Sequence, residues 1–203
     1  MRRKISTPDL LTEVRNDVIE AHHHFEVYRT YMHKRTRGRY QELFLVYGDF
    51  FACGLRGHFA AMIVGLGRVF DTDQRNISIA ALLKAAPDLE KVEEKKLARV
   101  RKIWKDQALH LRHEVVAHRH VGTTIEDSFK RAKISLNKIG ILIGLCRQLL
   151  DAWARKLNCF SHNQSSVKPD LMNVMDTLLR TRIERHAQER LQIERFSNRG
   201  SQT

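Results

Sequence analysis

The spacing of apolar residues constrains the fold of this chain more than any other feature. Apolar side chains recur every three or four residues through most of the sequence, which places them along single faces of helices. The first such stretch begins after Thr7 and Pro8, a pair typical of a helix N-terminus, and ends near Met32. No alternating apolar and polar run bounded by turn residues occurs, so the sequence predicts an all-α fold without a sheet.

About five long helices and one short helix are predicted. The long ones cover residues 7–32, 40–70, 88–118, 134–157 and 169–196, and the short one covers 78–86. Residues 33–39 are expected to form a basic loop, and residues 71–76 a polar one. Because the helices are amphipathic and the connections short, the pattern favours an up-and-down helical bundle. The helix over 40–70 is apolar on most sides, and we expect its glycines to allow close approach of a neighbouring element.

The length of the chain predicts one domain. Its 203 residues fit a single helical domain over residues 1–196, followed by a flexible C-terminal tail over 197–203. The three cysteines form no CxxC motif, which favours a reduced, intracellular setting. The longest uncharged run of the most apolar stretch, residues 57–67, is shorter than the roughly 20 residues that span a bilayer. We therefore expect a soluble cytoplasmic protein without a membrane association.

The charge balance indicates an anionic partner. Lys and Arg total 36 against 23 Asp and Glu, a net charge of +13. Charge of this size is informative about partners, and nucleic acid is its natural complement. The densest basic run, in which no acid intervenes, is expected to bind RNA and consists of Lys95, Lys96, Arg99, Arg101, Lys102 and Lys105. The alternative is a solvated helix face balanced by the acids Glu90, Glu93 and Glu94.

A cluster of arginine and histidine follows this run. Residues 111–120 read Leu-Arg-His-Glu-Val-Val-Ala-His-Arg-His, with five residues between Arg112 and His118. Four Arg-His pairs in the chain have four to six residues between them, so the spacing alone is not specific. Asn, Asp or His follows the arginine only at Arg112 and at Arg15, and only Arg112 lies at the end of a long helix within an apolar frame.

The cluster resembles the motif of the HEPN superfamily, and within it the AbiU2-like group associated with abortive infection in bacteria. That motif consists of an arginine, a polar residue, a short spacer and a histidine, which Arg112, His113 and His118 match. Looser similarity extends to residues 65–71 and 78–83, so that the resemblance covers residues 40–157 in outline. It implies a HEPN-like helical bundle and a homodimer that pairs its motifs across a shared groove.

The resemblance also implies a reaction. Active members of the superfamily cut RNA without a metal or other cofactor, using the neighbouring 2′-hydroxyl as nucleophile. Histidine suits the proton transfers, and arginine can donate two parallel hydrogen bonds to a phosphate. We assign proton transfer to His118, phosphate stabilisation to Arg112 and orientation or secondary proton transfer to His113. Arg119 and His120 are expected to bind RNA. The implied role is a toxin or effector in phage defence, with an antitoxin protein as a further partner.

Helix geometry limits this assignment. On an ideal helix, Arg112 and His118 would lie about 120° apart with roughly 9 Å of axial rise, so they would not share a face. Either the helix unwinds before His118, or a second protomer completes the cleft.

Other interpretations of the same residues stay open. Arg112 could be an ordinary surface residue, with His118 favoured near a helix C-terminus by the macrodipole. His110 and His113, with His118 and His120 nearby, could bind zinc, although no cysteine accompanies them. The whole protein could be a catalytically inactive module that binds RNA or a partner protein, or a scaffold for dimerisation.

Overall fold

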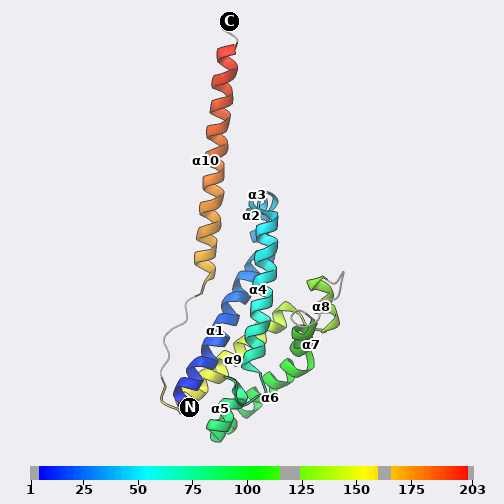
Figure 1. Ribbon diagram of the computed structural model, residues 1–203, viewed down its shortest axis with the longest axis vertical. Coiled ribbons are helices and arrows are strands. Elements are labelled where there is room, and N and C mark those ends of the chain that lie inside the picture. The colour runs from blue at the N-terminus through cyan, green and yellow to red at the C-terminus, as the bar shows by residue number, and fades with distance from the viewer. Residues whose placement is uncertain (1–4, 115–123, 160–165, 201–203) are drawn as a thin grey trace.

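The computed structural model describes residues 5–114, 124–159 and 166–200 of the chain. Within these ranges every regular element is helical and no strand occurs, which confirms the predicted all-α, HEPN-like bundle. Figure 1 shows the main helices packed along one another, with the C-terminal helix rising beyond them.

Three long helices form the centre of the bundle. Helix α1 (Thr7–Met32) packs against α4 (Gly48–Val69) and α9 (Leu136–Lys156). Ser6 caps α1 by accepting a hydrogen bond from the amide of Asp9. A glycine at each contact brings the helices close together, because a Cβ at Gly65 would lie 3.4 Å from that of Ala21. At the other contact, a Cβ at Gly140 would lie 2.7 Å from the ring of Phe25.

The segment after α1 differs from the prediction. Residues 33–39, predicted as a loop, form helix α2 (Lys34–Arg39), because the backbone bonds from Arg37 to His33 and from Tyr40 to Thr36 continue the helical pattern. The predicted helix over 40–70 is divided into α3 (Gln41–Val46) and α4. The division falls at Tyr47, whose φ of −107° and ψ of 35° depart from helical values.

The predicted helix over 88–118 is interrupted as well. After helix α5 (Ile79–Ala85), which confirms the predicted short helix, Pro87–Lys91 forms a 3₁₀ turn. Glu93 adopts a left-handed φ of 64°, so that α6 (Glu94–Ile103) begins only after it. A π-helical turn (Trp104–Ala108) and α7 (Leu109–Arg112) follow. The Trp153 indole anchors this region by donating to the carbonyl of Val92 at 3.2 Å.

Helix α8 (Ile125–Arg131) is absent from the predicted set. Thr124 and Asp127 form a capping box at its start, in which each side chain accepts from the backbone amide of the other residue. The helix is only seven residues long, too short for the periodicity of apolar residues to mark it.

Helix α10 (Lys168–Gly200) confirms the predicted final helix and continues past residue 196. It is held to the bundle near its start, where Met175 is buried and Asp176 accepts hydrogen bonds from Arg39 (2.8 Å) and from the Tyr40 hydroxyl (2.5 Å). Burial and this hydrogen bond raise the pKa of Tyr40 to about 12. Farther along, Arg182 pairs with Glu42 of α3 at 2.7 Å, and beyond this region α10 extends away from the bundle (Figure 1).

Helix α4 is the one described helix that is long and apolar enough to cross a membrane by length and composition alone. Core helices of soluble proteins meet the same criterion. The face of α4 that carries Phe59, Met62, Ile63 and Leu66 is fully buried within the bundle. One face of α4 therefore belongs to the core of the bundle.

Candidate functional site

Arg112 lies against the last turns of α4. Its side chain passes so close to Gly67 that a Cβ there would stand 2.7 Å from Nε and 2.9 Å from Cδ. The close approach expected from the glycines of this helix is thus observed, and Arg112 is the neighbour. Because Gly67 has no side chain, the arginine stem packs on the backbone of α4 while the residue stays partly exposed.

The charge of Arg112 is not neutralised by a described residue. Arg68, which follows Gly67 in the chain, forms ion pairs with Asp17 (3.0 Å) and Glu20 (2.7 Å), which join α4 to α1. By contrast, no carboxylate of residues 5–114, 124–159 or 166–191 forms an ion pair with Arg112. A partly exposed guanidinium in this state can bind an anion such as a phosphate.

The helix that carries Arg112 is positioned by aromatic packing and by its π-helical turn. Trp104, the first residue of this turn, stacks on Phe70 at the end of α4, with ring centroids 4.8 Å apart and an angle of 15° between the rings. Ala108 and Leu111 are fully buried beyond it. Single π turns within helices occur frequently at functional sites, because the extra residue changes the direction of the side chains that follow.

His113 and Glu114 extend the site toward α8. His113 is exposed, so its imidazole can reach a ligand in solvent. The Glu114 carboxylate lies 3.4 Å from Nε of Arg131, which links the end of the motif helix to α8. The other candidate residues of the motif, His118, Arg119 and His120, lie outside the described residues. Whether the helix unwinds before His118 or a second protomer completes the cleft is therefore still open.

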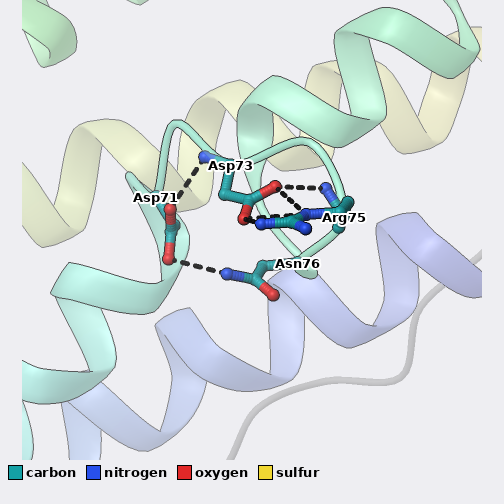
Figure 2. Close-up of polar contacts among 4 residues, drawn as sticks. All are labelled: Asp71, Asp73, Arg75 and Asn76. Carbon is teal, nitrogen blue, oxygen red and sulfur yellow. Dashed lines mark hydrogen bonds and ion pairs between the residues drawn. The ribbon is translucent and has the colours of Figure 1, made fainter.

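The loop after α4 is held by its own side chains (Figure 2). Asp71 accepts hydrogen bonds from the amide of Asp73 (2.8 Å) and from the side chain of Asn76 (3.1 Å). Asp73 in turn binds the Arg75 guanidinium through both carboxylate oxygens, and these hydrogen bonds lower its pKa. The sequence predicts only a polar loop here, although the Asp-x-Asp-x-Arg-Asn pattern signals such turns.

The predicted basic run occupies α6 and the π-helical turn. Two of its members are paired with acids, Lys96 with Glu93 (3.2 Å) and Arg101 with Glu90 (2.8 Å), as the solvated-face alternative expects. The remaining members are exposed and have no ion-pair partner among the described residues: Lys95, Arg99, Lys102 and Lys105. Lys95, Arg99 and Lys102 follow one another at helical spacing, so they share one face of α6.

The alternative zinc site is not assembled by the described residues. His110 and His113 are both exposed on or beside α7. No group of three or more His, Cys, Asp or Glu side chains within residues 5–114, 124–159 and 166–200 could hold a metal ion. His118 and His120 lie outside these ranges.

An all-helical bundle that carries an Arg-polar-x-x-x-x-His motif at the end of a long helical segment is typical of the HEPN class of protein. Comparison with family models gives a match to the AbiU2 model of this class, HEPN_AbiU2, over residues 8–166. This chain belongs to the AbiU2 family of HEPN domains. The match includes the whole candidate motif and ends before α10. No curated protein and no solved structure matched the chain.

Proposed function

We propose that this protein is a metal-independent endoribonuclease. The observation that carries the proposal is the Arg112 guanidinium, which is packed on Gly67, partly exposed, and free of an ion pair with any described carboxylate. A phosphate-binding arginine needs a fixed stem, because a preorganised charge stabilises a transition state at no cost of reorganisation.

The proposed reaction uses the ribose of the substrate itself. The 2′-oxygen attacks the adjacent phosphorus and the bond to the 5′-oxygen breaks, which leaves a 2′,3′-cyclic phosphate and a 5′-hydroxyl. His118 accepts the proton of the 2′-hydroxyl, and a proton is delivered to the departing 5′-oxygen. Arg112 binds the phosphate oxygens as negative charge develops on them, and His113 orients the substrate or performs the second proton transfer.

The distribution of charge supports an RNA substrate. Lys95, Arg99 and Lys102 form an unpaired basic face on α6, which leads directly into the helix of Arg112. Such a face can follow a phosphate backbone, and Arg119 and His120 would extend it. We further propose that the protein acts in the cytoplasm as a homodimer, as the toxin or effector of a phage-defence or toxin–antitoxin system, with an antitoxin protein that restrains it.

Cleavage of RNA in the presence of EDTA tests the enzymatic proposal. Total RNA should be cut by the wild type and left intact by Arg112→Ala and His118→Ala, and the products should carry 2′,3′-cyclic phosphate ends. The matched control is Arg180→Ala/His186→Ala, which removes an arginine and a histidine of the same spacing from α10. Wild-type protein that leaves RNA intact, or motif variants that cut like the control, would show that the proposal is wrong.

A catalytically inactive module is the second candidate function. It is favoured by the two ion pairs within the basic run, because paired charges are typical of a structural helix face. Retention of RNA that weakens with salt, without cleavage, would support this module.

A further inference from the structure

A cavity that opens to solvent lies where α8 meets α9. Its volume is about 520 Å³, and its lining includes Gln107 from the π-helical turn, Glu126 and Lys130 from α8, Lys133 from the turn after α8, and Lys138 from the first turn of α9. None of these residues belongs to the predicted RNA-binding set, because the basic run at residues 95–105 was the stronger signal in the sequence. The fold brings the three lysines together from two helices and the turn between them.

The charge of this cavity is positive. Lys130 is paired with Glu126 at 3.1 Å, so that these two side chains offset each other. Lys133 and Lys138 form no ion pair with any residue that the structure describes. The cavity also contains the N-terminus of α9, where the helix dipole adds a partial positive charge. An anion is the complement of such a lining.

The backbone of the cavity is fixed by hydrogen bonds. Lys133 adopts a left-handed φ of 49°, and the turn closes through the amide of Ile134, which donates to the carbonyl of Phe129 at 3.3 Å. The Gln107 amide donates to the carbonyl of Lys133 at 3.1 Å and ties the turn to the motif helix. The Gln107 Oε1 atom is buried without a hydrogen-bond partner among the described residues.

The cavity lies beside the motif helix but apart from the Arg112 contact. The ion pair between Glu114 and Arg131 holds α8 next to the end of this helix. Gln107 faces α8 and α9, whereas Arg112 lies against Gly67 of α4, so the two anion-binding positions occupy different sides of one helical segment. A single phosphate cannot bind at both positions, but a chain of phosphates can.

We infer that this cavity binds phosphate groups of the RNA strand away from the bond that is cut. The inference rests on the proposed function, since it supplies a second binding position for the same substrate. Lys133 and Lys138 provide the charge that binds these phosphates.

Binding of an RNA that cannot be cleaved tests the inference without relying on activity. The probe is a fluorescein-labelled, fully 2′-O-methylated single strand, titrated by anisotropy at several salt concentrations. Lys133→Asn/Lys138→Gln removes both unpaired charges, and asparagine tolerates the left-handed φ of residue 133. We expect a Kd about 5- to 20-fold weaker than that of the wild type. The salt slope should fall by about 1.4, which is about 0.7 for each phosphate whose lysine is replaced.

The matched control is Lys156→Gln/Lys168→Gln, which removes two exposed lysines at the far end of α9 and the start of α10. This control should bind RNA like the wild type, and thermal unfolding should show that both double variants are folded. Equal weakening in the two double variants, or no weakening in either, would overturn the inference while leaving the nuclease proposal intact. If the wild type does not cut RNA but Lys133→Asn/Lys138→Gln binds RNA more weakly than the wild type, the nuclease proposal is wrong while the inference that the cavity binds RNA stands.

Inorganic phosphate provides the second arm of the test. We expect calorimetry to show no saturable binding of phosphate alone in the micromolar range, because two lysines hold a single small anion weakly in water. Saturable binding of phosphate that the cavity variant abolishes, with unchanged affinity for RNA, would assign the cavity to a small phosphate ligand instead.

Discussion

At the scale of single residues, the contact between Gly67 and Arg112 places the arginine of the motif against α4. The sequence identifies both residues, since glycines in an apolar helix suggest close approach and the motif marks the arginine. It does not reveal that they touch, because they lie 45 positions apart and meet only through the packing of α4 against α7. The positions of His118, Arg119 and His120 stay predictions.

Replacing Gly67 with alanine should abolish RNA cleavage without unfolding the protein. The new Cβ would lie 2.7 Å from Nε of Arg112, so the guanidinium has to move off α4, while the alanine favours the helix. The measurements are RNA cleavage and thermal unfolding of the same preparation.

The control for this substitution is Gly57→Ala in the same helix, where no atom lies within 4 Å of the new Cβ. It should keep full cleavage and gain up to about 1 kcal/mol of unfolding free energy from helix propensity. Normal cleavage by Gly67→Ala would show that the guanidinium does not need its place on α4.

At the scale of elements, the helices that the sequence predicts well are those with a long apolar period or a clear cap. Residues 7–32, 78–86 and 134–157 are of this kind, and all three are helical in the structure. The breaks at Tyr47 and Glu93 and the π-helical turn were not predictable, since they arise from packing between helices rather than from local propensity. The short helix α8 depends on its capping box, not on a repeating apolar pattern.

The contact between α1 and α4 should make stability depend on pH. Nδ1 of His24 lies 2.9 Å from Nδ1 of His58, and burial is the main cause that lowers the pKa of each from its ordinary value of 6.5. The charge of Glu20 raises the pKa of His24, whereas His23 lowers it. The pKa of His58 is further lowered by His24. One ring must donate a hydrogen bond and the other accept it, which requires a neutral acceptor.

The sign of this dependence follows from where the protons bind. The unfolded chain takes up protons near pH 6.5, whereas the folded protein takes them up only at lower pH, so stability is full above 6.5 and falls as the pH drops below it. The free energy of unfolding, measured with urea at pH 7.5 and 5.5, should fall less between these two pH values for His24→Gln/His58→Gln than for the wild type. The control is His110→Gln, which replaces an exposed histidine and should show the same fall in unfolding free energy as the wild type. A fall in the double variant as large as that of the wild type would contradict the prediction.

At the scale of the whole molecule, the ion pairs between α10 and the bundle extend, among the described side chains, as far as His186. Met175, Asp176 and Arg182 anchor it to α1, α2 and α3, whereas Ile183, beside the last of these anchors, and Leu191, beyond it, are exposed. Apolar residues exposed singly are common on soluble proteins, but these two lie on a helix that leaves the bundle (Figure 1). In the proposed homodimer, this part of α10 is available to a second copy.

Ile183→Lys/Leu191→Lys should therefore convert a dimer into a monomer. A charge placed at each of the two exposed apolar positions opposes their burial, and sedimentation velocity reports the change in mass. Ile141→Lys on α9, which alters an apolar residue that is also exposed, should leave the dimer intact. Monomeric wild-type protein at tens of micromolar would count against the homodimer itself.

The π-helical turn at Trp104–Ala108 has a consequence for how such a chain can vary. This turn holds one residue more than an α-helical turn does, so losing a single codon within it would restore a continuous α-helix. Later side chains of that helix would keep nearly the same direction, because the α-helical turn completes about the same rotation with one residue fewer, and the arginine would still meet the glycine that receives it. A deletion of one residue within α6, which has no extra residue to lose, would instead rotate Arg112 by roughly 100° about the helix axis and away from Gly67.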